Sequence, residues 1–149
     1  MNNHPMGPSF KHLLNSGVSI RGIFSGLNSP VIIEMSAYAG FDFVIIDNEH
    51  GTSGYESTEY FLRTANSCGI PTVIRSFPQD ITRLLDAGAT AIQVPMIESA
   101  EQAKNILDMM KFPPAGHRGV AFSSRAAGYG AFGGPGHMDK SNKEIALIA

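Results

Sequence analysis

The chain has 149 residues, of which 43% are hydrophobic and 16% are charged, a composition typical of a globular chain with one core. Its formal net charge is −2 and it has no run of lysines or arginines, which argues against a nucleic-acid partner. No apolar stretch reaches the ~20 residues of a membrane span, the single Cys68 excludes an internal disulfide, and no signal-peptide pattern opens the chain. We therefore expect one cytoplasmic domain over residues 1–149, with no membrane partner.

Short β-rich runs alternate with amphipathic segments along the chain. We predict strands at residues 18–24, 41–47, 71–75 and 91–96, and helices at residues 29–39, 53–67, 79–87 and 99–111. The first three helices end at Gly40, Gly69 and Gly88, and the pair Pro113-Pro114 prevents continuation of the fourth. This alternation predicts repeated βα units over a parallel sheet.

The pattern changes in the last quarter of the chain. Residues 115–136 are rich in glycine and are expected to form a loop, and residues 144–149 begin a fifth strand. Four βα units and a fifth strand are fewer than the eight units of a β/α barrel, whose usual size is ~250 residues. The pattern therefore fits the N-terminal part of a (β/α)8 barrel, and an open doubly wound sheet fits five strands as well.

Ionisable residues follow two neighbouring predicted strands. Asp47, Glu49 and His50 come at the end of the second strand, and Arg75 ends the third. The carboxyl ends of parallel strands share one edge of a sheet, so these four side chains are expected to converge. An acid beside a histidine raises the basicity of the imidazole, and an arginine binds a carboxylate or stabilises an enolate. Such a set suits proton abstraction next to a carbonyl group.

A purely structural role is the competing interpretation of the same residues. In that case Asp47 caps the turn, His50 is an ordinary loop histidine, and Arg75 pairs with Asp47. For any one residue the two interpretations carry about equal weight, and the joint placement of all four favours a site.

Five motifs in order resemble the HpcH/HpaI family of metal-dependent pyruvate aldolases. They are Asp47-Asn48-Glu49-His50, Val73-Ile74-Arg75, Leu84-Leu85-Asp86-Ala87-Gly88, Val94-Pro95-Met96, and Pro113-Pro114-Ala115-Gly116-His117-Arg118-Gly119-Val120. The resemblance covers nearly the whole chain. It implies a TIM-type β/α barrel and a carbon-carbon lyase that cleaves 4-hydroxy-2-oxo acids, such as 2-keto-3-deoxy sugar acids, reversibly to pyruvate and an aldehyde through a metal-stabilised enolate.

The resemblance also implies roles for individual residues. His50 matches the general base, Arg75 the residue that stabilises the enolate, and Asp86 the acid that raises the basicity of the histidine. In the family that acid reaches the histidine of a neighbouring subunit, which implies a homo-oligomer. Asp47 and Glu49 would surround metal-bound water.

The resemblance places the two direct metal ligands, a Glu and an Asp, beyond Ala149. We therefore expect a divalent metal cofactor, with magnesium, manganese or cobalt as candidates, whose direct ligands are absent from these residues, and we expect the sequence to be a fragment. Arg118 and Arg125 are candidates for the border of the substrate pocket or a subunit contact. A simple exposed loop is the alternative for both.

Two other functions remain open at this point. The missing metal ligands fit a non-catalytic remnant that acts only as an assembly or binding module. An acyl-CoA lyase of the related superfamily would keep the enzyme but change the chemistry, and no nucleotide-binding pattern in the sequence favours it.

Overall fold

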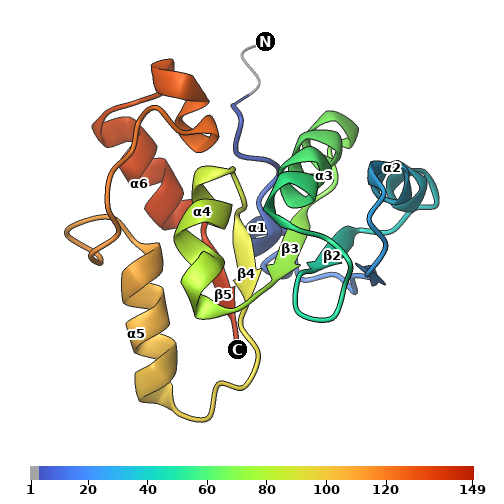
Figure 1. Cartoon of the computed structure of the whole chain (residues 1–149), viewed down its shortest axis with the longest axis horizontal. Coiled ribbons are helices and arrows are strands. Elements are labelled where there is room, and N and C mark those ends of the chain that lie inside the picture. The colour runs from blue at the N-terminus through green and yellow to red at the C-terminus, as the bar shows by residue number, and fades with distance from the viewer. Residues whose placement is uncertain (1–3) are drawn as a thin grey trace.

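The computed structural model describes residues 4–149 and contains one sheet of five parallel strands (Figure 1). The strands are β1 (Gly22–Ser25), β2 (Phe43–Asp47), β3 (Thr72–Arg75), β4 (Ala91–Gln93) and β5 (Ala146–Ile148). They lie in the sheet in the order β1-β2-β3-β4-β5, which is their order in the sequence. A doubly wound sheet reverses its strand order at a switch point, whereas a β/α barrel does not. The order therefore confirms the barrel-type arrangement of four βα units and a fifth strand.

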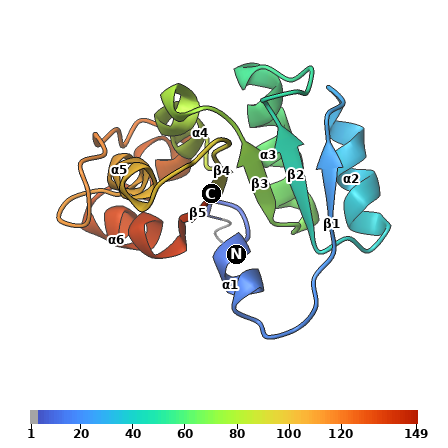
Figure 2. The same cartoon turned by 90° about the horizontal axis from the view of Figure 1, so that it is seen from below.

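Helices connect the strands. They are α2 (Pro30–Tyr38), α3 (Tyr55–Cys68), α4 (Ile81–Asp86), which follows the short η1 (Pro78–Asp80), and α5 (Ala100–Met110). Figure 2 shows α2 and α3 on one side of the sheet, and the five-residue α1 (Phe10–Leu14) on the other side. The predicted helix ends hold. Gly40, Gly69 and Gly88 follow α2, α3 and α4 with left-handed φ values of 81°, 71° and 102°. The Ser99 hydroxyl accepts a hydrogen bond from the backbone N–H of Gln102 at the start of α5.

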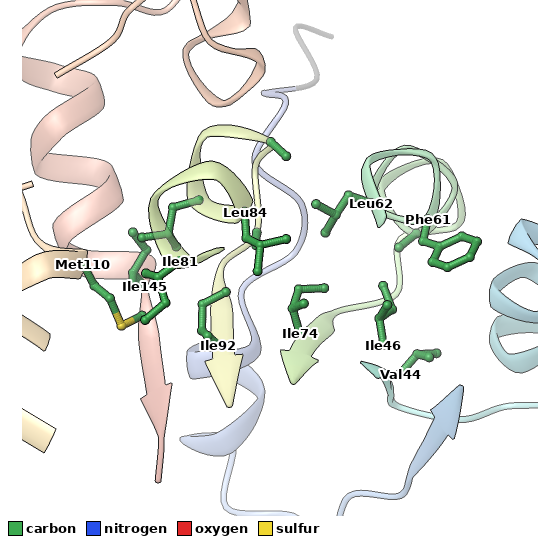
Figure 3. Packing of buried hydrophobic residues seen from close by; sticks show 14 of the residues in the cluster. Val44, Ile46, Phe61, Leu62, Ile74, Ile81, Leu84, Ile92, Met110 and Ile145 are labelled. Atoms are coloured by element: carbon green, nitrogen blue, oxygen red, sulfur yellow. The ribbon is translucent and has the colours of Figure 1, made fainter. Parts of the chain in front are cut away.

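The central strands β2, β3 and β4 carry apolar residues on both faces. Residues such as Val44, Ile46, Ile74 and Ile92 point toward the helices and pack against Phe61, Leu62 and Leu84 in the main core (Figure 3). The alternate residues Ile45, Val73 and Ala91 face the other way, into a second cluster that includes Phe10 of α1. This double burial explains why the second strand is a continuous apolar run rather than an alternating one.

Two helices and some strand ends differ from the prediction. The predicted loop at residues 115–136 contains η2 (Arg125–Gly130) and the start of α6 (Pro135–Glu144). The buried residues of α6 are only His137 and Ser141, so this helix lacks the apolar periodicity by which helices are predicted. The fourth strand ends at Gln93 rather than residue 96; Pro95 cannot donate to a strand ladder, and Met96 adopts a left-handed φ of 59°. The first begins at Gly22 rather than residue 18.

Among residues 4–149, no helix combines the length and the hydropathy that crossing a membrane requires.

Candidate active site

An ion pair between Asp47 and Arg75 is the centre of the candidate site. Asp47 ends β2 and Arg75 ends β3, and the two residues are partners in the parallel register of these strands. The Arg75 guanidinium donates two hydrogen bonds to the Asp47 carboxylate, from Nε to Oδ1 at 2.9 Å and from Nη2 to Oδ2 at 2.6 Å. This bidentate geometry fixes the plane of the guanidinium at the carboxyl edge of the sheet.

Asp47 also shapes the loop that follows β2. Its Oδ1 accepts hydrogen bonds from the backbone N–H groups of Glu49 at 3.1 Å and His50 at 3.2 Å. The turn cap and the Asp47–Arg75 pair that the structural interpretation predicted are therefore both present. They position the loop, and they leave Arg75 and His50 at the same edge of the sheet.

Glu49 lies between the arginine and the histidine. Its Oε2 is 3.3 Å from Nε of Arg75, and its Oε1 is 3.6 Å from Nε2 of His50. The Glu49 side chain is 10% exposed, whereas the side chain of His50 is 72% exposed. The sequence prediction that these four residues converge is confirmed, and the imidazole is accessible from outside.

A close backbone contact holds this loop in place. A Cβ on Gly51 would lie 2.0 Å from the backbone oxygen of Asp47, so only glycine fits at this position. Asn48 anchors the loop to α3 through a hydrogen bond from Nδ2 to the Thr58 hydroxyl at 2.9 Å. Local packing thus fixes where Glu49 and His50 leave the strand.

The charges of the central pair are stabilised by each other. The hydrogen bonds from Arg75 lower the pKa of Asp47 from 3.8 to about 2, with smaller contributions from the N–H groups of His50 and Glu49, against the opposing effect of burial. Asp47 in turn raises the pKa of Arg75. Both side chains are therefore charged at neutral pH, and Arg75 keeps a positive charge where an anionic substrate could bind.

Phe24 and Gln93 extend this edge of the sheet, and the sequence analysis missed both. The guanidinium carbon of Arg75 lies 5.0 Å from the centroid of the Phe24 ring at the end of β1. Gln93 ends β4 in register with Arg75. Because the strand was predicted to run to residue 96, Gln93 was not recognised as a polar residue at a strand end. Pro95, which cannot donate to a strand ladder, was the signal for the earlier end.

Asp86, Arg118 and Arg125 meet at the C-terminal end of α4, which leads back toward the start of β4. Nη2 of Arg118 is 2.6 Å from Oδ1 of Asp86, and its guanidinium carbon is 4.4 Å from the centroid of the Phe112 ring. Nη1 of Arg125 donates to the backbone oxygen of Ala87. Both arginines are buried, with exposed fractions of 4% and 8%, so the simple exposed-loop interpretation is wrong. Within one chain these residues hold α4 and do not join Arg75.

The carboxylates at the edge do not form a metal site by themselves. Asp47 accepts four hydrogen bonds, and Glu49 faces both Arg75 and His50. Across residues 4–149, no group of three or more His, Cys, Asp or Glu side chains is arranged to hold a metal ion. A hard cation needs several oxygen ligands, so these residues do not fit as its direct ligands.

The fold and the edge define a class of protein: a β/α-barrel-type chain with an acid–arginine–histidine cluster at the carboxyl ends of its strands. The model of the family described as HpcH/HpaI aldolase/citrate lyase matches residues 21–149, and the chain belongs to this family. The family is generally metal-dependent.

Relatives and solved structures agree with this assignment. The chain is 34% identical to a hydroxypyruvate/pyruvate aldolase of Deinococcus radiodurans over 97% of its length and 53% of the relative. It is also 34% identical to a 4-hydroxy-2-oxovalerate aldolase of Novosphingobium aromaticivorans, over 95% and 54%. A HpcH/HpaI aldolase/citrate lyase family protein of Burkholderia cenocepacia superposes with a TM-score of 0.83 at 31% identity, over 92% of this chain and 56% of that one. The chain thus spans about half the length of these relatives and forms part of a barrel.

Proposed function

We propose that the Asp47–Arg75 edge belongs to the active site of a carbon-carbon lyase that cleaves a 4-hydroxy-2-oxo acid to pyruvate and an aldehyde. The observation that carries the proposal is the fixed guanidinium of Arg75 at the carboxyl edge, with Glu49 between it and His50. The names of the relatives, pyruvate aldolase and 4-hydroxy-2-oxovalerate aldolase, support the same chemistry. Both substrates of the reverse reaction are small molecules.

Arg75 binds the 2-oxo acid in this proposal. Two hydrogen bonds to Asp47 fix the plane of the Arg75 guanidinium, and the Phe24 ring packs against it. The orientation of the guanidinium is therefore set before a ligand binds. Negative charge develops on the C2 oxygen as the enolate forms, and a preoriented cation stabilises that charge more than the neutral ketone.

His50 takes the proton from the C4 hydroxyl. As this proton leaves, the C3–C4 bond breaks, the C4 carbonyl of the aldehyde forms, and the electron pair of the broken bond passes into the enolate. Protonation at C3 then gives pyruvate. The exposure of His50 leaves its imidazole free to meet the substrate hydroxyl, and Glu49 lies 3.6 Å from its Nε2.

Asp86 supports His50 only between subunits. In its own chain Asp86 pairs with Arg118 at the end of α4, away from His50. The proposed contact with the histidine of a neighbouring copy therefore requires a homo-oligomer.

The divalent metal is proposed at the level of the family alone. Magnesium or manganese suits the oxygen ligands that the resemblance implies, with cobalt as a third candidate. Asp47 and Glu49 would face the water around such a metal. The steps assigned to His50 and Arg75 depend on this chain's own side chains.

Retro-aldol cleavage by a His50→Ala variant of the full-length protein tests the role of the base. We expect the rate of pyruvate release from a 4-hydroxy-2-oxo acid to fall by about 10²- to 10⁴-fold, with an unchanged unfolding midpoint because the side chain is exposed. His117→Ala, at another exposed histidine, is the control. A His50→Ala enzyme that releases pyruvate at the unmodified rate would remove His50 from the mechanism.

A further inference from the structure

A polar cavity of about 190 Å³ lies behind the loop of residues 48–54, which carries Glu49 and His50. One wall is formed by this loop and the start of α3, and the other by η1 and the first turn of α4. The volume far exceeds the ~15 Å³ that one water molecule needs, and it is below the ~300 Å³ at which pockets for drug-sized ligands begin. The cavity therefore has room for a small organic molecule. Four polar side chains line it: Asn48, Ser53, Asp80 and Arg83.

The cavity is separate from the Arg75 edge of the sheet. Leu84 lines the cavity and belongs to the helix-facing core. Val73, two residues before Arg75, belongs to the cluster on the opposite face, so the Arg75 side chain also lies on that face. The loop is the element that the two places share. Because Asn48 and Ser53 both line the cavity, a ligand there would contact the loop near both of its ends.

The lining contains hydrogen-bonding groups that have no partner among residues 4–149. The Ser53 hydroxyl has less than 1 Å² of exposed area and no hydrogen-bond partner. Asn48 uses one of its two amide N–H donors on the Thr58 hydroxyl. Asp80 makes no capping hydrogen bond to α4. A buried hydroxyl without a partner costs about 1–3 kcal/mol, and a ligand that bonds to Ser53 would remove this cost.

Arg83 and Asp80 give the lining one positive and one negative charge. The guanidinium carbon of Arg83 lies 4.2 Å from the centroid of the Tyr55 ring, a contact that leaves the N–H donors in the guanidinium plane free. The ion pairs that arginines form within residues 4–149 do not include Arg83 or Asp80. The two charges balance, so the lining favours neither an anion nor a cation.

We propose that this cavity binds a small neutral polyol and that the bound molecule holds the loop of residues 48–54 in place. Each hydroxyl group of a polyol both donates and accepts hydrogen bonds. Arg83 and Asn48 supply donors, and Asp80 supplies an acceptor. The Ser53 hydroxyl can act as either. An apolar molecule would leave all of these groups without partners, at a cost in free energy.

The inference goes beyond the proposed function and does not depend on it. The residues assigned to the reaction do not line the cavity, so binding can be measured without catalysis.

Hydrogen exchange of the backbone amides, measured on the full-length protein with erythritol as the polyol, tests the proposal. At a concentration of about twice the Kd, the amides of residues 49–54 should exchange about threefold more slowly, and this protection should saturate. General stabilisation by an excluded osmolyte acts on the whole protein and does not saturate in this way. Glycine, a zwitterion, and inorganic phosphate, an anion, should give no protection of the loop.

Two variants locate the binding in the cavity. Arg83→Met keeps an unbranched side chain beside Tyr55 but removes the donors, and it should raise the Kd for erythritol about tenfold. Ser53→Ala should raise it about fivefold. Arg21→Met, at an exposed arginine just before β1, is the control and should leave the Kd unchanged.

The outcomes separate this inference from the proposed function. The inference is wrong if erythritol gives no saturable protection, if Arg83→Met binds it as tightly as the unmodified protein, or if glycine or phosphate protects the loop instead. Erythritol protection in a protein that does not cleave 4-hydroxy-2-oxo acids would contradict only the proposed function.

Discussion

Asp47 is a single buried carboxylate that both builds a turn and holds the arginine at the end of the next strand. Its two oxygens receive two hydrogen bonds from the Arg75 guanidinium and two from the backbone of the following loop. The structural role of Asp47 is therefore compatible with the function that we propose for Arg75. The same contacts that stabilise the turn also set the orientation of the cation at the strand end.

Asp47→Asn should change stability in a pH-dependent way. The pKa of Asp47 is about 2 in the folded chain and 3.8 as its ordinary value, so the carboxylate stabilises the fold by about 2 kcal/mol above pH 4. That contribution is lost as the pH falls from about 4 to 2, because the unfolded chain takes up the proton first. Urea unfolding at pH 7 should therefore show a loss of about 2 kcal/mol in the variant, and a smaller difference near pH 2.

Asp139→Asn, at an exposed aspartate of α6, is the matched control and should leave stability within ~0.5 kcal/mol. An Asp47→Asn variant that unfolds like the unmodified chain at pH 7 would show that the pair with Arg75 does not stabilise the fold.

The loop after β2 is the element that brings His50 to the edge, and its geometry depends on Gly51. Gly51→Ala would force a methyl group against the backbone oxygen of Asp47, where a Cβ would lie 2.0 Å away. The loop must then shift, which we expect to cost about 1–3 kcal/mol and to displace His50. Gly119→Ala, where a Cβ meets nothing within 4 Å, should cost much less. The midpoint of thermal unfolding and the rate of aldol cleavage should both fall in Gly51→Ala and change little in Gly119→Ala. Equal behaviour of the two variants would contradict the proposed loop geometry.

The end of α4 depends on the pair between Asp86 and Arg118. The guanidinium of Arg118 is almost fully buried, so removal of its partner leaves a buried charge unpaired. We expect Asp86→Asn to lower the free energy of unfolding by about 3 kcal/mol. The double variant Asp86→Leu with Arg118→Met should recover much of this loss, because it removes both charges. A cost below ~0.5 kcal/mol for Asp86→Asn, measured by urea unfolding, would show that the pair is not structural.

Sequence reasoning succeeded where the signal was local and failed where it was not. The glycine after α3 and the serine before α5 predicted helix ends from short-range chemistry. The helix α6 escaped prediction because few of its residues are apolar. The partner of Asp86 also escaped, since it lies 32 residues away in the chain and only tertiary packing brings the two together. The convergence of Asp47 and Arg75 was predictable because parallel strands end at one edge.

At the scale of the whole molecule, the order of the five strands explains the site. A parallel sheet that keeps the sequence order places every strand end at one edge, and the inner face carries Asp47, Arg75 and Gln93 in one layer. The resemblance to HpcH/HpaI aldolases, drawn from five motifs, is confirmed by the family match over residues 21–149. The structure adds which of the motif residues meet within a single chain: Arg75 meets Asp47 and Glu49, Glu49 meets His50, and Asp86 meets Arg118.

The most direct test of the central claim is deuterium exchange at the methyl group of pyruvate, because enolisation needs the strand-end residues but no particular aldehyde. Full-length protein should catalyse this exchange, and a chelator should abolish it. Arg75→Lys, which keeps the charge beside Asp47 but loses the guanidinium fork, should lower the rate by about a hundredfold. Exchange that is absent from the unmodified protein, or that continues unchanged in Arg75→Lys, would contradict the assignment of this edge as an enolate-forming site.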